Sequence, residues 1–466
     1  MKWLENVANV FRIPDLRNRV LFTMALLAVY RIGGHIPTPG IDANALQSFF
    51  ERNAGTLFGF MDLFSGGQFR RLTIFALGIM PYITASIILQ LLAVVIPTLE
   101  KLQKEGELGR RKITQWTRYL TIGLSIVQSF GIALTLMKSQ GSFVLNPGIR
   151  FILMTVLTLT AGSTFIMWLG EQITERGIGN GMSLIIFAGI VVNLPRAIEG
   201  IYVNVVETKQ WSVFMLLFLL VVMTLVVAFV VLVERGERRI PVQYAKRVVG
   251  RRMMGGQSTH LPMKVNAGGV MPVIFASSLL TFPQTLVAVD FVRSNKYLSG
   301  MLNSIRYDEP LYELLYMVGI VLFAFFYVSI IFNPVEVADN MRKYGGFIPG
   351  IRPGKRTSDY INEILTKITL VGGLYLALLS VIPDFMIGGI RLHHLPLVGT
   401  FFDQHVSRVI LEGLNVNFYF GGTSLLIVVG VAMDTINQIE AQLIMRHYDG
   451  FTPKSGRIRG RRSTFS

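Results

Sequence analysis

Long apolar runs constrain this chain more than any other feature of its sequence. Eight runs are strong, and two weaker ones lie at residues 20–34, interrupted by Arg31, and at residues 182–194, ended by Pro195. A helix needs about 20 mostly apolar residues to cross a hydrocarbon core about 30 Å thick, and only helices or closed barrels satisfy their backbone hydrogen bonds there. The runs are too long for barrel strands, so they predict an all-α polytopic membrane protein. The strong runs are residues 73–97, 119–137, 151–168, 213–233, 267–289, 311–332, 368–382 and 418–433.

Composition supports this class of protein. Hydrophobic residues make up 52% of the 466 residues and charged residues only 15%, which argues against a soluble multidomain enzyme. The chain has no cysteine, so disulfides, thiolate metal sites and cysteine nucleophiles are excluded. The net charge of +16 predicts basic cytoplasmic loops, a polyanionic partner, or both.

The distribution of Lys and Arg favours ten spans with both termini in the cytoplasm. Short cytoplasmic loops collect Lys and Arg, and under this topology the inner segments hold 31 of the 44 basic residues. Without a span at 182–194, the loop at 234–266, which contains Arg251 and Arg252, would face outside. The inner segments are residues 1–19, 98–118, 171–181, 234–266, 334–367 and 446–466.

The segment before the first span, residues 1–19, has apolar residues at helical spacing, which indicates a helix lying along the inner membrane surface. A frayed basic tail is the alternative. The first apolar run leads into GGHIPTPG instead of a small-residue cleavage site, so we expect this span to remain in the mature protein.

An internal repeat divides the chain. Residues 78–86, GIMPYITAS, match residues 269–277, GVMPVIFAS, at six of nine positions. The two segments begin the second and the seventh span, so the repeat unit is five spans, and an odd number of crossings inverts one half relative to the other. We expect a first half at residues 20–201 and a second at 212–447, followed by a basic cytoplasmic tail at 448–466. A chance match of small and apolar residues is the weaker alternative.

A short apolar piece at residues 57–68, LFGFMDLFSGGQ, cannot cross a bilayer, and its paired glycines favour a break. Irregular backbone at membrane depth is tolerated where protein or a water-filled cavity surrounds it. The piece is therefore interpreted as a half-inserted helix in a vestibule, with an ordinary external loop as the alternative.

Motifs for catalysis are missing from the sequence. There is no HExxH zinc pair and no Walker lysine motif, and GIGNG at residues 177–181 is interpreted as a flexible turn. We therefore expect no enzyme activity, no cofactor and no metal site. An intramembrane protease is disfavoured. A secondary transporter of a small solute remains the alternative, although acidic residues are scarce inside the spans.

Motifs along nearly the whole chain resemble the SecY/Sec61-alpha family, the channel subunits of the Sec protein translocase. They are RIGGHIPTPG (31–40), LFSGG (63–67), FALGIMPYITASIILQLL (75–92), EGELGRRKITQ (105–115), ERGIGNG (175–181), RRIPVQYAKR (238–247), YGGFIPGIRPG (344–354) and FYFGGTSLLIVV (418–429). The resemblance implies a protein-conducting channel that passes unfolded secretory polypeptides and releases membrane segments sideways into the bacterial cytoplasmic membrane.

The resemblance also implies roles for individual residues. The apolar pore ring would comprise Ile79, Ile83, Met182, Ile186, Ile274 and Ile427. The plug would include Phe60, Asp62, Phe64, Gly66 and Gly67. The lateral gate, where spans two and seven separate, would include Thr84, Gln90, Ser278 and Phe282. Met182 stands where isoleucine is common in the family, but it is apolar and flexible, so we expect the seal to survive.

Two basic cytoplasmic loops carry the implied partner contacts. Their residues are Arg238, Arg239, Lys246, Arg247, Arg251 and Arg252 in one loop, and Arg352, Lys355 and Arg356 in the next. The implied partners are the SecA motor ATPase, the ribosome and its RNA, the small subunits SecE and SecG, signal peptides, nascent chains and the lipid bilayer. Orientation bias alone would explain part of this charge. The outer loop at 387–414 is long for the family, which leaves the shape of the outer face open.

Overall fold

The computed structural model describes residues 13–42, 45–47, 62, 65–138, 143–207, 213–244, 247–249, 252–254, 259–286, 310–388 and 422–449. Several expected features lie outside these residues: Phe60, Phe64, Lys246, Arg251, the segment 1–12, most of the outer loop and the tail from residue 450. The backbones of Arg247, Arg252 and Phe282 are placed, but their side chains lie outside the described part.

A helix lies at the place of every expected span. The first half contains α2 (Pro14–Gly33), α5 (Met80–Val95), α6 (Pro97–Lys104), α7 (Glu107–Lys138), α8 (Ile149–Arg176), α9 (Gly181–Val191), α10 (Leu194–Tyr202) and a π-helical turn (Val203–Glu207). The second half contains α11 (Val213–Glu234), α12 (Met271–Leu286), α15 (Pro310–Ile331), α16 (Pro334–Lys343), α17 (Lys355–Gly388) and α20 (Gly422–Asp449). Within the described ranges, six helices are long and apolar enough to cross a membrane, or seven if α5 and α6 form one broken span.

The second span differs from its expected bounds. The apolar run begins at residue 73, but residues 69–79 form turns and α5 begins only at Met80. Gly78 has a φ of +57°, which a helix cannot contain, and Pro81 lies in the first turn of α5, where proline is tolerated. At the other end, Pro97 cannot continue the helix, and α6 leaves α5 at 106°.

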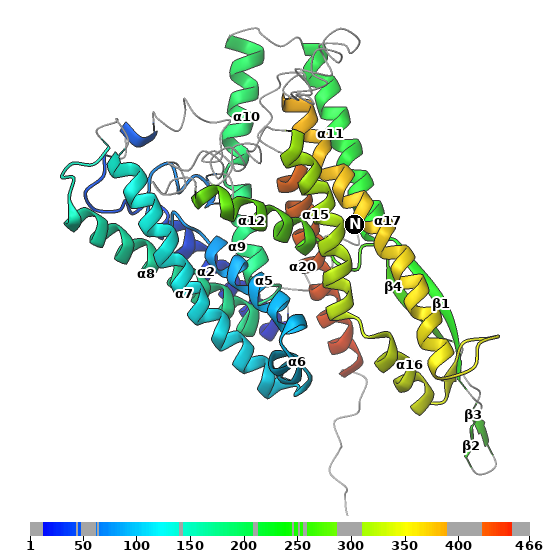
Figure 1. Cartoon of the computed structure of the whole chain (residues 1–466). Helices are drawn as coiled ribbons and strands as arrows, with labels where there is room; N and C mark the ends of the chain where they lie inside the picture. Colours follow the sequence, from blue (N-terminus) through cyan, green and yellow to red (C-terminus); the bar gives the residue numbers. More distant parts are fainter. Residues whose placement is uncertain are drawn as a thin grey trace, which may run out of the picture.

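The helices form two groups that meet along the middle of the molecule (Figure 1). In the first group α7 packs against α5 and α8, and in the second group α15 packs against α12 and α17. The groups contact each other through α5 with α12 and through α9 with α20. One hydrophobic cluster runs across these junctions and contains buried residues of both halves.

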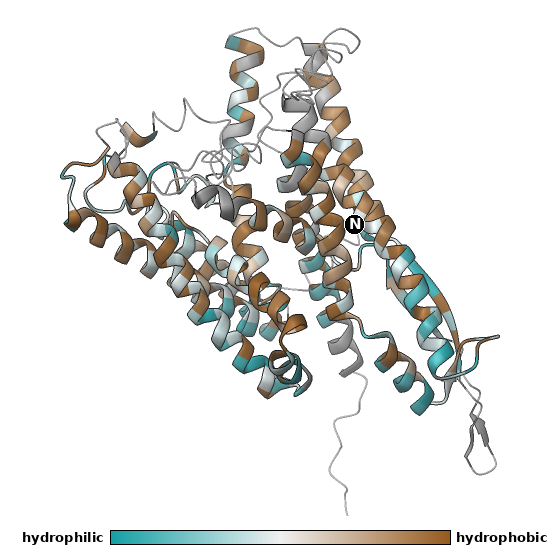
Figure 2. Ribbon diagram, in the orientation of Figure 1, coloured by the Kyte–Doolittle hydropathy of each residue, from teal (hydrophilic) through white to brown (hydrophobic). Residues whose placement is uncertain are grey.

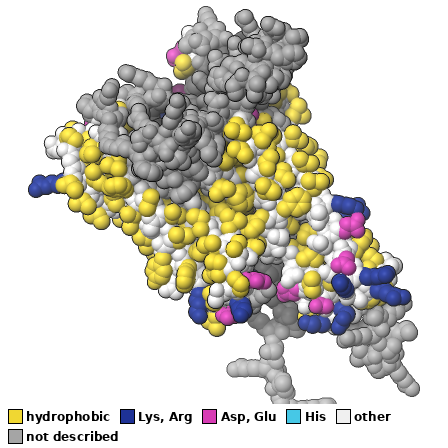
Figure 3. Space-filling model, in the orientation of Figure 1, with side chains coloured by type: hydrophobic (Ala, Val, Ile, Leu, Met, Phe, Trp, Pro, Cys, Tyr) yellow, Lys and Arg dark blue, Asp and Glu magenta, His cyan; other side chains and the backbone are white. Residues whose placement is uncertain are grey.

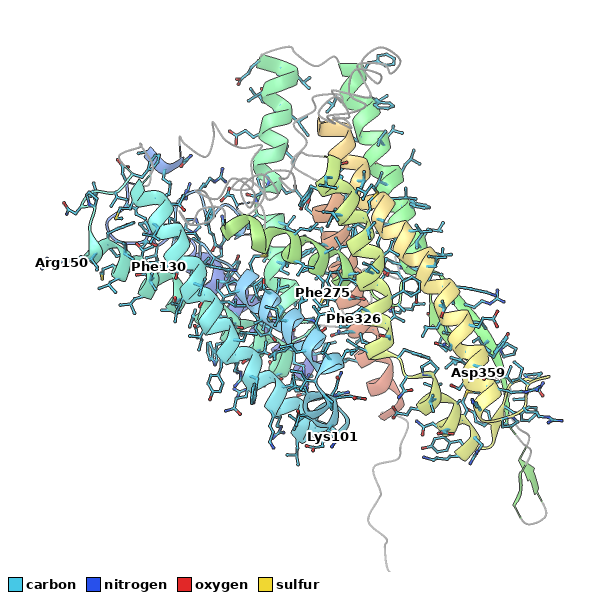
Figure 4. All side chains as sticks on the ribbon, viewed as in Figure 1. Lys101, Phe130, Arg150, Phe275, Phe326 and Asp359 are labelled. Atoms are coloured by element: carbon cyan, nitrogen blue, oxygen red, sulfur yellow. The ribbon has the colours of Figure 1, made fainter. Side chains whose placement is uncertain are left out.

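The surface is apolar around the middle of the helices and charged at one end. Figure 2 shows hydrophobic residues along the helices and hydrophilic residues toward their lower ends, and Figure 3 shows Lys, Arg, Asp and Glu side chains gathered there. Lys101 and Asp359 lie at this lower end, whereas Arg150 lies at the other end of the first group (Figure 4). The segments expected to be cytoplasmic at 98–118 and 334–367 thus share one side of the molecule.

Small sheets link the two basic loops at this end, which the sequence did not predict. Strand β1 (Glu237–Tyr244) pairs antiparallel with β4 (Thr259–Lys264) and, at its far end, with β5 (Gly346–Phe347). A hairpin of β2 (Arg247–Val249) and β3 (Arg252–Met254) lies beyond them. Ile240 and Val242 of β1 pack with Met341 of α16 and Ile361 of α17 in a separate core. The two loops therefore form one folded unit.

Candidate functional site

Six apolar side chains from four helices belong to, or pack against, the hydrophobic cluster that runs across the junction of the halves. Ile79 and Ile83 stand at the start of α5, Met182 and Ile186 on α9, Ile274 on α12 and Ile427 on α20. The five isoleucines are buried members of the central hydrophobic cluster, and Met182 packs against it. Exposed fractions of 6% for Ile83, 2% for Ile274 and 0% for Ile427 show that these side chains face protein and not the surrounding membrane. We call these six residues the waist.

The repeat fixes the position of two waist residues. Gly78 and Gly269 both have a φ of +57°, and each is followed by a helix start with Met and Pro in its first turn. The amide of Ile83 donates to the carbonyl of Ile79 (3.1 Å), and the amide of Ile274 donates to the carbonyl of Val270 (3.2 Å). Matched sequences thus build matched helix starts that place Ile83 and Ile274 on facing elements.

The GIGNG turn positions the waist residues of α9. Asn180 caps this helix, and its Oδ1 accepts from the amides of Met182 (3.1 Å) and Ser183 (3.4 Å). The amide of Ile178 donates to Oγ1 of Thr23 in α2 (3.1 Å), and the amide of Gly179 donates to Oε1 of Gln438 in α20 (3.0 Å). The turn expected from the sequence is present, but its hydrogen bonds to two other helices were not predicted.

A cavity of about 300 Å³ opens on one side of the waist. Its apolar wall includes Ile83, Met182, Ile186 and Ile274. Its polar wall is formed by Ser86, Thr114, Arg118, Glu171, Thr174, Glu175, Asn180 and Ser183. We call this cavity the funnel. Residues of five helices line it: α5, α7, α8, α9 and α12.

Sequence patterns did not single out Glu171 or Arg118 as candidate site residues. The two side chains form an ion pair across α7 and α8, with 2.8 Å between Arg118 Nε and Glu171 Oε1. The signal in the sequence was the presence of charges near span ends, but which charges share a cavity depends on how α7 packs against α8. In the described ranges, no three His, Asp or Glu side chains come together in a way that could hold a metal ion.

The expected plug residues that the structure describes, Asp62, Gly66 and Gly67, lie on the other side of the waist. A small cavity of about 10 Å³ there is lined by Ser65, Gly78, Ile79 and Ile186, among others. Gly66 has a φ of +72°, and a Cβ at this position would lie 2.8 Å from the Cα of Gly189 in α9. Only glycine therefore allows this close approach of the segment to α9.

Polar contacts hold the same segment at Asp62. Its buried carboxylate accepts from the amide of Arg70 (2.9 Å) and lies 3.5 Å from Arg70 Nε. The amide of Gly67 donates to the carbonyl of Asp62 (2.9 Å), and Arg31 donates to the carbonyl of Gly66 (3.4 Å). The described plug residues are thus fixed against α2 and α9 next to the waist.

The expected lateral-gate residues lie on α5 and α12, which contact each other. Thr84 and Ser278 are buried, and Thr84 Oγ1 donates to the carbonyl of Met80 (3.0 Å). Gln90 Nε2 donates to Oγ of Ser86 (3.2 Å). The hydrogen bonds of Thr84 and Gln90 stay within α5, and among the described residues Ser278 Oγ has no hydrogen-bond partner, so these gate side chains do not tie α5 to α12.

The described cations of the two basic loops are exposed. Arg238 and Arg239 lie on β1, whereas Arg352, Lys355 and Arg356 follow β5. Gly350 and Gly354 have φ values of +82° and +106°, which fold the chain sharply around Arg352. The carbonyl of Arg352 accepts from Thr357 Oγ1 (2.9 Å), so its backbone is held while its side chain is free to contact a partner.

An apolar waist between two inverted helical halves, with a funnel on one side and a packed segment on the other, defines a membrane channel or transporter. Comparisons with known proteins decide between them. The SecY family model matches residues 73–436. A protein translocase subunit SecY of Streptomyces galbus is 48% identical over 456 residues, covering 95% of this chain and 98% of that protein.

Solved structures share the fold. A protein-conducting channel has a TM-score of 0.61 at 19% identity, covering 93% of this chain and 94% of that one. The Sec61 chain of a canine ribosome–channel complex from the endoplasmic reticulum has a TM-score of 0.58 at 19% identity, with the same coverage. The chain belongs to the SecY family of protein translocase subunits. It is a multi-pass membrane protein and a protein-conducting channel, so the interpretation as a small-solute transporter loses its support.

Proposed function

We propose that the waist is the pore ring through which an extended polypeptide passes. The observation that carries this proposal is the convergence of Ile79, Ile83, Met182, Ile186, Ile274 and Ile427 in one buried cluster between the funnel and the plug segment. An apolar constriction excludes water when no polypeptide occupies it, and the absence of water limits the flow of ions. Branched side chains then close around a chain that enters.

The plug proposal rests on the segment that contains Asp62, Gly66 and Gly67. This segment seals the side of the waist opposite the funnel, and Phe60 and Phe64 are proposed to belong to it. Since Gly66 lies against Gly189 of α9, a movement of α9 changes the space available to the plug. Opening the waist and releasing the plug are therefore coupled.

The seam between α5 and α12 is proposed as the lateral gate, with Thr84, Gln90, Ser278 and Phe282 along it. Since the described gate side chains Thr84, Gln90 and Ser278 form no hydrogen bond across the seam, the two helices separate at low cost when an apolar segment replaces their contact. Each central Leu of a passing chain favours lipid by roughly 0.3–0.6 kcal/mol, whereas each Lys or Asp opposes it by roughly 2.5–3.5 kcal/mol. The amino-acid composition of the passing segment thus determines whether it moves through the lateral gate into the lipid.

The united basic loops are proposed to dock the motor or the ribosome. Exposed cations from both loops share one folded unit, and such a surface suits phosphate-rich RNA or an acidic protein face. Arg352 is the proposed coupling residue, and Lys246, Arg247, Arg251 and Arg252 extend the surface. We propose SecA, the ribosome, SecE and SecG as partners, together with signal peptides, nascent chains and lipid. The resemblance to Sec61 in a ribosome–channel complex supports the ribosome among them.

The proposed setting is the bacterial cytoplasmic membrane, with both termini in the cytoplasm. The proposed organisation is an interfacial segment at 1–19, halves at 20–201 and 212–447, and a tail at 448–466. The sequence contains no Walker lysine motif, so the chain is proposed to catalyse no reaction itself. A motor, translation or the membrane potential is then proposed to drive transport in one direction.

Reconstitution tests this proposal. The purified complex in liposomes, with the motor and ATP, is expected to protect a secretory precursor from added protease. The same liposomes are assayed for uptake of small solutes without the motor. Solute uptake without precursor protection would overturn the proposed function.

A further inference from the structure

Three charged side chains in the funnel have no role in the mechanism described above. Glu171 and Glu175 lie one turn apart on α8, and Arg118 faces them from α7. Arg118 pairs with Glu171 at 2.8 Å. The funnel wall therefore carries a net negative charge, although the rest of this end of the molecule is strongly basic.

The position of these charges relates them to the seam. The same cavity is lined by Tyr82 and Ile83 of α5 and by Met271, Ile274 and Phe275 of α12. A segment that enters between α5 and α12 from the funnel therefore has the two carboxylates beside its near end. Phe275 lies at the middle of the molecule, between the two helix groups (Figure 4).

We propose that Glu171 and Glu175 bind the basic flank of an apolar segment that enters the seam, and that Arg118 competes with this flank for Glu171. The inference rests on the proposed lateral gate, and it identifies the basic flank as the part of the substrate that the funnel binds. Signal segments consist of a basic stretch followed by an apolar one. With the apolar part in the seam, the basic part lies in the funnel, where these carboxylates stand.

The exposure of the ion pair suits exchange of partners. The side chain of Glu171 is 12% exposed and that of Arg118 is 44% exposed. Glu171 is thus held in place, whereas Arg118 can turn away into the open funnel when a Lys or Arg of the substrate arrives. Glu175 is exposed on the same wall and adds attraction. Partly solvated ion pairs contribute little binding free energy, so the two carboxylates are expected to change the initial rate of translocation only moderately.

The test compares two secretory precursors that differ only in a basic or an uncharged flank before the apolar stretch. Initial translocation rates are measured with the full complex, motor and ATP in liposomes without an imposed potential. The measured quantity is the rate ratio of the basic to the uncharged precursor. Lipid and motor effects enter this ratio equally for every channel variant.

Substitution of the carboxylates and substitution of Arg118 are expected to change this rate ratio in opposite directions. The double variant Glu171→Gln with Glu175→Gln lowers the ratio about two- to fivefold, because partly solvated pairs contribute modestly. Arg118→Gln raises it, because Glu171 then has no competing partner. Glu171→Gln and Arg118→Gln break the same bond between α7 and α8, so a purely structural role would shift both in the same direction.

Glu363→Gln is the matched control, since this exposed carboxylate pairs with Lys367 on α17 outside the funnel. Its ratio is expected to equal that of the unmodified protein. Normal export with an unchanged ratio in the funnel variants, or shifts of the same sign, would overturn the inference and leave the channel function intact. A complete lack of export of either precursor by the unmodified complex would overturn both.

Discussion

Gly78 and Gly269 share one backbone conformation, a φ of +57°, at the starts of two helices that contact each other across the middle of the molecule. A Cβ at either position would have its nearest neighbour at 3.9 Å, so space does not require glycine there. Glycine is required there because the backbone is left-handed, a conformation that other residues rarely adopt. The two halves thus repeat a conformation as well as a sequence, and this repeat places Ile83 opposite Ile274.

Alanine at either glycine is therefore expected to destabilise the protein through backbone strain. Gly78→Ala and Gly269→Ala should each cost about 1–2 kcal/mol, since an L-residue in this region costs that much. Thermal unfolding of the purified protein in detergent measures the loss. Gly319→Ala in α15 is the control, because its Cβ would meet Ala276 at an ordinary 3.4 Å and its φ is not positive. Equal stability of all three variants would refute the strain argument.

Polar substitution in the waist is expected to loosen the seal. Ile83→Ser or Ile274→Ser adds a hydroxyl to the constriction, which favours water there and so raises ion leak through the idle channel. The same variants should export precursors with defective signals. Val94→Ser on α5 and Leu279→Ser on α12 are matched controls, since these side chains are 57% and 44% exposed. Planar-bilayer conductance that is as low in the waist variants as in the controls would rule out the ring.

The class of fold could be predicted from the sequence because membrane physics leaves few solutions for long apolar runs. The repeat also predicted that residues 83 and 274 would lie on matched elements, and both lie in the central cluster. The start of α5 could not be predicted, because hydropathy continues unbroken from residue 73 while a left-handed Gly78 interrupts the backbone. Hydropathy reports the side chains, whereas the helix start depends on a single dihedral angle.

The contacts among loops were beyond sequence reasoning for a different reason. The pairing of β1 with β5 joins segments about 100 residues apart through only two pairs of residues, which leave little periodic signal in the sequence. Similarly, the pair of Arg118 and Glu171 depends on the packing of two long helices. Such contacts follow from tertiary geometry, which local patterns do not encode.

Loss of the α9 cap is expected to affect both stability and the seal. Asn180→Ala removes the acceptor for the amides of Met182 and Ser183, which should cost about 1 kcal/mol and let the waist residue Met182 move. Asn180→Ser keeps an acceptor and should restore most of the loss.

A second cap provides the control for this prediction. Asn333 caps α16 through the amides of Val335 and Glu336, far from the waist. Asn333→Ala should lower the unfolding temperature by a similar amount without raising ion leak. If both variants leak equally, the effect is a general loss of stability and the positioning role of Asn180 is wrong.

Reversal of charge at Arg352 is expected to abolish motor-driven export with little effect on folding. The side chain is exposed, and the hydrogen bond at this position involves its carbonyl, which Arg352→Glu retains. ATP-dependent export in liposomes and thermal unfolding separate the two effects. Arg150→Glu, at the opposite end of the first helix group, should leave export unchanged. Normal export by Arg352→Glu would remove this residue from the coupling surface.

Site-specific photocrosslinking of a stalled secretory chain tests the conduction path most directly. Probes at residues 83, 186, 274 and 427 should each crosslink to the arrested polypeptide, because these buried side chains of four helices belong to the cluster between the halves, which is the proposed pore ring. Probes at 94 and 217, whose side chains are exposed on the outer surface, should not. Adducts at the exposed positions and none at the four buried ones, with export intact, would contradict a path between the halves.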